Sequence, residues 1–161
     1  MFWKSNCLIF TCLFILSGCV KRIPKESIYP FSQADKIEVI SYPDRMSWDK
    51  EPGSKIFVNE ALRFDEKNIK ERVILNEELV EKLYSFLFIE ECSLLSETTR
   101  CYMPRHAILF YDLDGDLYNY IEVCLECAKS EANFQHNKIC PEKAKNLKKI
   151  FKEAGIKYFS E

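Results

Sequence analysis

Hydrophobic and polar residues alternate in several short stretches of the chain, and this alternation predicts β-strands. The clearest stretch runs from Lys36 to Tyr42 and ends at Pro43, while 56–58 and 71–75 carry weaker strand patterns. Two more strand-like runs, 106–112 and 117–124, flank Asp114-Gly115. This dipeptide tolerates the positive φ angles of a two-residue type I′ turn. The pattern therefore predicts an antiparallel hairpin within a small sheet.

Apolar residues recur at intervals of three and four in two other stretches, which predicts two helices. The first follows Asn76, a residue suited to cap a helix, and carries two glutamates in its first turn. The second begins near Pro141 and runs to Ala154, where Gly155 is expected to end it. The sequence thus predicts an α+β fold, in which a small antiparallel sheet with a central hairpin packs against two helices.

The N-terminus carries a signal of a different kind. One positive charge at Lys4 precedes a short apolar run that ends in Leu16-Ser17-Gly18-Cys19. A run of this length is typical of a secretory signal, because it is too short to span a membrane as a stable helix. The tetrapeptide resembles the lipobox of bacterial lipoproteins, in which diacylglycerol alkylates the cysteine before cleavage. The resemblance implies that residues 1–18 are removed and that Cys19 is lipidated, so that acyl chains hold the protein on a lipid bilayer.

The segment after Cys19 contains prolines and charged residues and shows little apolar periodicity. We therefore expect a lipidated N-terminus and tether over residues 19–34 and a single α+β domain over 35–161. In such lipoproteins an aspartate directly after the acylated cysteine retains the protein at the inner membrane, and this chain has Val20 there. The resemblance implies an exported protein that is lipid-anchored to the cell envelope, with the outer membrane favoured if the host has two membranes.

Composition narrows the range of partners. The 161 residues include 23 Lys and Arg against 25 Asp and Glu, and only four glycines. A nearly balanced charge provides no field to attract nucleic acid, and so few glycines exclude a glycine-rich phosphate loop. We expect no nucleic-acid partner, and we expect the lipid bilayer and an envelope protein as the candidate partners.

Eight cysteines are the unusual feature of the composition. Cys7 and Cys12 leave with the signal, and Cys19 carries the lipid. The disulfide candidates that remain are Cys92, Cys101, Cys124, Cys127 and Cys140. Because five is an odd number, at least one of them lies outside any bridge within the chain.

The predicted hairpin gathers three of these thiols. A two-residue turn at Asp114-Gly115 places Tyr111 opposite Tyr118 and His106 opposite Val123. Extending this register carries the residues before the first strand toward those after the second. We therefore expect one cysteine–histidine cluster at the open end of the hairpin. Its members are Cys101, His106, Cys124 and Cys127.

Three hypotheses apply to this cluster. In the first, Cys101 forms a disulfide with Cys124 or Cys127, which closes a loop of roughly two dozen residues and stabilises the exported domain by about 3 kcal/mol. In the second, the three thiolates and the imidazole bind Zn²⁺ as a closed tetrahedral site. In the third, Cys124 and Cys127 perform thiol redox chemistry, although the nearby Glu122 and Glu126 would raise their pKa. Cys92 and Cys140 have no assigned partner.

The stretch from Cys101 to Cys127 also resembles a segment of uncharacterised exported proteins from Bacteroidetes-type bacteria. This resemblance covers roughly a sixth of the chain and implies a shared hairpin but no activity. The sequence contains no Ser-His-Asp order, and its two histidines leave few groups for acid–base catalysis. We expect a non-catalytic envelope interaction or structural module with no cofactor. The alternative is a thiol-redox or zinc-binding protein that uses the cysteine–histidine cluster.

Overall fold

The computed structural model describes residues 23–44, 57–58, 61–62, 66–93 and 101–159. In these ranges five strands form one antiparallel sheet in the order β4-β1-β5-β6-β7, and β2 pairs with β3 in a separate hairpin. The strands are β1 (Lys36–Ser41), β2 (Phe57–Val58), β3 (Ala61–Leu62), β4 (Glu71–Ile74), β5 (His106–Tyr111), β6 (Leu117–Cys124) and β7 (Lys129–Ala132). The helices are α1 (Glu77–Tyr84), a π-helical turn η5 (Ser85–Ile89) and α2 (Pro141–Ala154), with short 3₁₀ helices η1 (Lys25–Ser27), η2 (Phe31–Gln33) and η4 (Glu66–Asn68).

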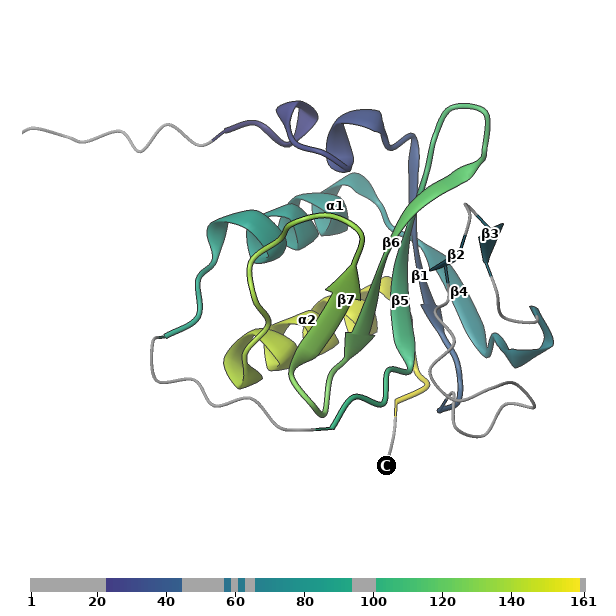
Figure 1. Cartoon of the computed structure of the whole chain (residues 1–161), viewed down its shortest axis with the longest axis vertical. Helices are drawn as coiled ribbons and strands as arrows, with labels where there is room; N and C mark the ends of the chain where they lie inside the picture. Colours follow the sequence, from purple (N-terminus) through teal and green to yellow (C-terminus); the bar gives the residue numbers. More distant parts are fainter. Residues whose placement is uncertain (1–22, 45–56, 59–60, 63–65, 94–100, 160–161) are drawn as a thin grey trace, which may run out of the picture.

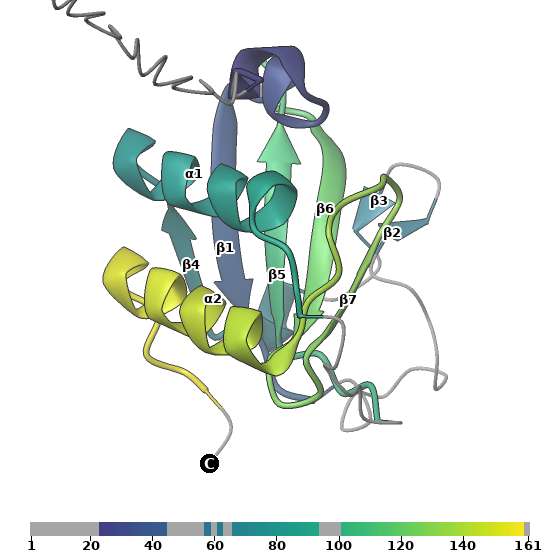
Figure 2. The same ribbon diagram turned by 90° about the vertical axis from the view of Figure 1, so that its left-hand side faces the viewer.

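Both long helices lie on the same face of the sheet (Figure 2). The main core fills the space between these layers, because one face of each central strand is apolar. Val39 of β1, Ile108 and Phe110 of β5, and Leu83 and Leu147 of the helices are fully buried there. The layers are also visible in profile (Figure 1). The predicted α+β fold, a small antiparallel sheet against two helices, is confirmed.

The ends of the helices follow from their local sequence. The side chain of Asn76 accepts a hydrogen bond from the backbone N–H of Leu79 at 3.0 Å, which caps α1. Pro141 is the first residue of α2, and Gly155 ends that helix with a φ of 113°, a conformation that favours glycine. Both predicted helix starts and the predicted end of α2 are confirmed.

The β5–β6 turn differs from the prediction. The backbone N–H of Gly115 donates to the carbonyl oxygen of Asp112, and the N–H of Asp112 donates to the carbonyl of Asp116, both at 3.1 Å. The loop therefore has three residues instead of two, and Gly115 has the positive φ of 83° typical of such loops. The Asp112 carboxylate stabilises it by accepting backbone N–H groups of Asp114 and Asp116.

The longer loop shifts the register at the top of the hairpin only. Tyr111 pairs with Leu117 instead of Tyr118, because the register slips between Phe110 and Tyr111. Below this irregularity the predicted pairing of His106 with Val123 is confirmed.

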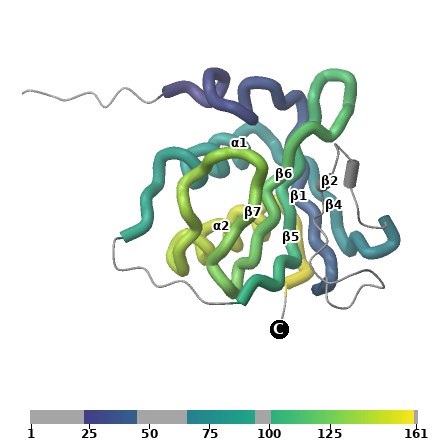
Figure 3. The backbone as a smooth tube through the Cα atoms, viewed as in Figure 1, coloured from purple at the N-terminus to yellow at the C-terminus, as the bar shows by residue number. Residues whose placement is uncertain are grey.

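The segment before β1 packs on the domain. Phe31 of η2 is buried, and its ring lies edge-on to Tyr84, Phe88 and Phe110 with centroid distances of 5.5, 5.9 and 5.4 Å. The second half of the segment expected as a tether, 19–34, therefore contacts the domain, through ion pairs of Lys25 with Glu77 and Glu81 and through the buried ring of Phe31. The signal sequence and Cys19 lie outside the described residues. Figure 3 shows this segment and the β5–β6 loop at one end of the sheet and the C-terminus at the other.

Candidate functional site

Cys124 and Cys127 form a disulfide with each other across the turn between β6 and β7. Their Cα atoms are 5.2 Å apart, and the backbone N–H of Cys127 also donates to Sγ of Cys124. Both residues are fully buried. Ala128, the next residue, has a φ of 49°, so the chain turns sharply at this point. The bridge fixes the turn that brings β7 against β6.

A second disulfide joins Cys92 to Cys140, which are 48 residues apart in the sequence and 5.9 Å apart at Cα. It ties the segment after η5 to the residue that precedes α2. The predicted bridge from Cys101 to Cys124 or Cys127 is wrong: Cys101 is exposed and takes part in neither disulfide. The reason is local, because the β6–β7 turn is so short that its own two cysteines lie within bonding distance.

The structure does not bring the cysteine–histidine cluster together. Side chains alternate between faces along a strand, so Val123 points into the helix-side core together with His106, and Cys124 points to the other face. The ring of His106 packs against Phe151 and Phe159. Within the described ranges no three cysteine, histidine, aspartate or glutamate side chains are arranged to hold a metal ion.

His106 instead holds the C-terminal segment. Its Nε2 lies 3.0 Å from the carbonyl oxygen of Tyr158, and its Nδ1 is buried with no hydrogen-bond partner in the described structure. Burial lowers the pKa of His106, so the ring is neutral and Nε2–H donates to Tyr158. Glu71 accepts backbone N–H groups from Lys157 and Tyr158 and the hydroxyl of Ser41. Burial raises the pKa of Glu71, but these donors outweigh it and the net shift is downward.

We expect stability to fall as the pH is lowered from 7 to 5. An unfolded histidine takes up a proton near pH 6.5, whereas burial lowers the pKa of both His106 and His136 in the folded chain. The unfolded state therefore binds more protons in this window, which costs up to about 1.4 kcal/mol per pH unit for each histidine. The stabilisation by the Glu71 carboxylate is present above the pKa of about 4.5 that the residue has in the unfolded chain, and it is lost as the pH falls below that value toward the lowered pKa of the folded state.

Urea denaturation at a series of pH values measures this slope. The double variant His106→Gln with His136→Gln should remove most of it between pH 7 and 5. A slope that stays the same in the double variant would contradict the assignment.

A hollow of about 430 Å³ lies along β7. One wall consists of the consecutive residues 128–131, and the others come from Tyr102 and from the segment before α2, where His136, Lys138 and Ile139 line it. Oγ of Ser130 lies 2.7 Å from Nε2 of His136 and fixes that ring in the wall. We call this space the β7 hollow.

A second hollow of about 280 Å³ begins on the other side of Ala128, which lines both. Lys145 and Lys148 of α2 line it together with Leu125 and Glu126 of the β6–β7 turn. Neither hollow is predictable from the sequence, because β7 has no apolar alternation and His136 lies in a polar stretch.

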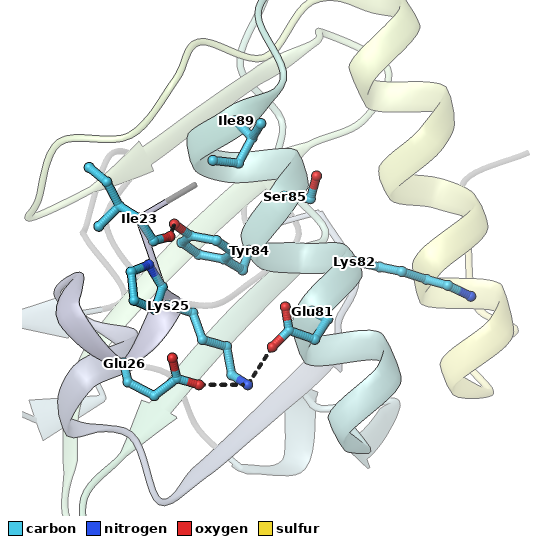
Figure 4. A pocket seen from close by; sticks show the side chains of 9 residues that line it. Ile23, Lys25, Glu26, Glu81, Lys82, Tyr84, Ser85 and Ile89 are labelled. Carbon is cyan, nitrogen blue, oxygen red and sulfur yellow. Dashed lines mark hydrogen bonds and ion pairs between the residues drawn. The ribbon is translucent and has the colours of Figure 1, made fainter. Parts of the chain in front are cut away.

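A third hollow of about 460 Å³ lies where the described chain begins (Figure 4). Ile23 and Pro24 form one side, and α1 and η5 form the other. The ammonium group of Lys25 points to Glu81 and Glu26 and also pairs with Glu77. These bonds, the one to Glu77 above all, raise the pKa of Lys25 and tie η1 to α1.

Comparisons with protein-family models, with curated proteins and with solved structures found no match for this chain. Among the described residues, no helix is long and apolar enough to cross a membrane. The arguments for function therefore come from the residues and their geometry.

Proposed function

We propose that this chain is an exported bacterial lipoprotein, anchored through acyl chains on Cys19, and that its folded domain is a non-catalytic interaction or structural module of the cell envelope. The observation that carries the proposal is the sequence Leu16-Ser17-Gly18-Cys19, which ends four residues before Ile23, where the described chain begins. A cleaved and acylated Cys19 would leave a folded domain directly behind the anchor.

The disulfides support an exported location. The two bridges join Cys92 to Cys140 and Cys124 to Cys127, and of these residues Cys124, Cys127 and Cys140 are buried. Disulfides of this kind persist in oxidising compartments and are rare in reducing ones.

The short spacer supports a domain held close to the bilayer. Four residues span at most about 14 Å when fully extended, and η1 and η2 are packed on the domain. The end of the sheet that carries these segments would therefore face the membrane, and the β6–β7 turn at the opposite end would face away from it (Figure 1).

The alternative functions have less support. Thiol redox chemistry needs an accessible sulfur, whereas Cys124 and Cys127 are fully buried. A zinc site would need His106 and Cys124 to converge, and they lie on opposite faces of the sheet.

Replacing the proposed acylation site should move the protein off the membrane. In cells fed radiolabelled palmitate, we expect the native chain to take up label and to sediment with membranes, and Cys19→Ala to lose both properties. Cys101→Ala is the matched control and should retain both. If the Cys19→Ala variant still sediments with membranes and the native chain takes up no label, the proposal is wrong.

A further inference from the structure

β7 is an edge strand of the five-stranded sheet in the described structure. Its inner side pairs with β6 from Ile121 to Cys124, and the β7 hollow lies along it. Because four consecutive residues, 128–131, line that hollow, it opens on the edge of the strand and not on one face of the sheet. An edge of this kind presents backbone N–H and C=O groups that an extended peptide can pair with.

The charge around this edge is positive. The β7 hollow is lined by two lysines, Lys129 and Lys138, and by one glutamate, Glu131. The adjoining hollow is also lined by two lysines, Lys145 and Lys148, and by one glutamate, Glu126. Arg105 lies 3.8 Å from Glu126 and offsets part of its charge. Four lysines against two glutamates contrast with the whole chain, which has a net charge of −2. The edge therefore repels a basic strand and attracts an acidic one.

The position of the edge narrows the class of ligand. The β6–β7 turn lies at the opposite end of the sheet from η1 and η2 (Figures 1 and 2). An anchor at Cys19 would therefore direct the two hollows away from the lipid headgroups. The charged donors of both hollows are lysines, and an ammonium group attracts carboxylates and phosphates alike. The orientation away from the headgroups therefore favours the carboxylates of an extended chain over lipid phosphates.

We propose that an extended acidic peptide segment of an envelope protein binds along the outer edge of β7, which pairs with no other strand in the described part of the chain. Its backbone adds a strand to the sheet, and its carboxylates contact Lys129 and Lys138. The adjoining hollow, with Lys145 and Lys148, extends the same site past Ala128. This inference depends on the proposed function for the location of the partner and for the orientation of the hollows away from the lipid headgroups.

The test uses the purified full chain in nonionic detergent at physiological salt. The probe is a short synthetic peptide in which glutamate alternates with valine, and the control peptide has lysine in place of glutamate. We expect backbone amide chemical shifts to change at 129–132 with the acidic peptide only. Lys129→Glu combined with Lys138→Glu should weaken binding at least about tenfold.

Two further variants separate a local effect on peptide binding from a general effect of charge or folding. Lys149→Glu combined with Lys152→Glu reverses the same charge on exposed positions of α2 that line neither hollow, and it should change the affinity less than about twofold. Lys138→Gln alters one exposed position, which keeps the fold intact, and should weaken binding about threefold.

Three results would overturn the inference. In the first, the acidic peptide leaves the amide chemical shifts of β7 unchanged. In the second, charge reversal at Lys129 and Lys138 weakens peptide binding no more than the control pair does. In the third, phosphatidylglycerol vesicles or polygalacturonate shift the β7 amides and the peptide does not. The proposed function fails separately, because a chain that takes up no palmitate could still show peptide-dependent shifts at β7.

Discussion

Removing the Cys92–Cys140 disulfide should lower the free energy of unfolding by about 4 kcal/mol. The bridge spans 48 residues of sequence, and a crosslink over such a loop strongly reduces the conformational entropy of the unfolded chain. It also connects two parts of the fold that the sheet does not join, the segment after η5 and the start of α2. The variant is Cys92→Ala with Cys140→Ala, measured by urea denaturation under oxidising conditions.

The other cysteines provide the comparison. The Cys124–Cys127 bridge spans three residues of sequence, so its chain-entropy contribution is only about 2 kcal/mol. Cys101→Ala alters an exposed residue outside both bridges and should change stability by less than about 0.5 kcal/mol. If the Cys92 and Cys140 double variant is as stable as Cys101→Ala, this bridge does not stabilise the domain.

Phe110→Ala should cost about 3–5 kcal/mol. Phe110 is fully buried in the middle strand of the sheet, and its ring lies edge-on to Phe31 at 5.4 Å and to Phe134 at 6.1 Å. Truncation would leave a cavity between the sheet, the N-terminal segment and the segment after β7, because the last two segments both pack on this one ring.

An exposed residue of the adjacent loop provides the control for this variant. Leu113 is 85% exposed, and Leu113→Ala should change stability by less than about 0.5 kcal/mol. Urea denaturation of both variants measures the difference. A loss below about 1.5 kcal/mol for Phe110→Ala would show that the core does not depend on this ring.

Local patterns predicted most of the fold. A strand or helix that buries one face shows this in the periodicity of its apolar residues. This holds for the alternation from Lys36 to Tyr42 and for the three- and four-residue spacing after Asn76. The ends of the helices are also determined locally, because each end residue acts on backbone groups within one helical turn. These residues are Asn76 at the start of α1 and Pro141 and Gly155 at the two ends of α2.

The features that were missed depend on contacts between distant residues. β7 is short and polar, so its pairing with β6 follows from the turn at Cys124–Cys127 and not from its own pattern. Phe31 docks on rings far along the chain, which makes the N-terminal segment part of the core.

The candidate site was misassigned for a related reason. The register predicted for His106 and Val123 was correct, but the alternation of side chains puts His106 and Cys124 on opposite faces of the sheet. The pairing of Cys92 with Cys140 depends on how η5 and α2 pack against each other, and this packing cannot be predicted from the spacing of the cysteines in the sequence. The basic edge of β7 needs residues from three segments and becomes visible only in the folded chain.

The intact mass of the protein extracted from membranes, measured before and after reduction, tests lipidation at Cys19 and both disulfides together. We predict a chain that begins at Cys19 and carries diacylglycerol, and a rise of about 4 Da on reduction, two hydrogens for each disulfide. A mass equal to that of the unmodified chain from Met1 would contradict lipidation at Cys19. A mass that reduction leaves unchanged would contradict the two disulfides.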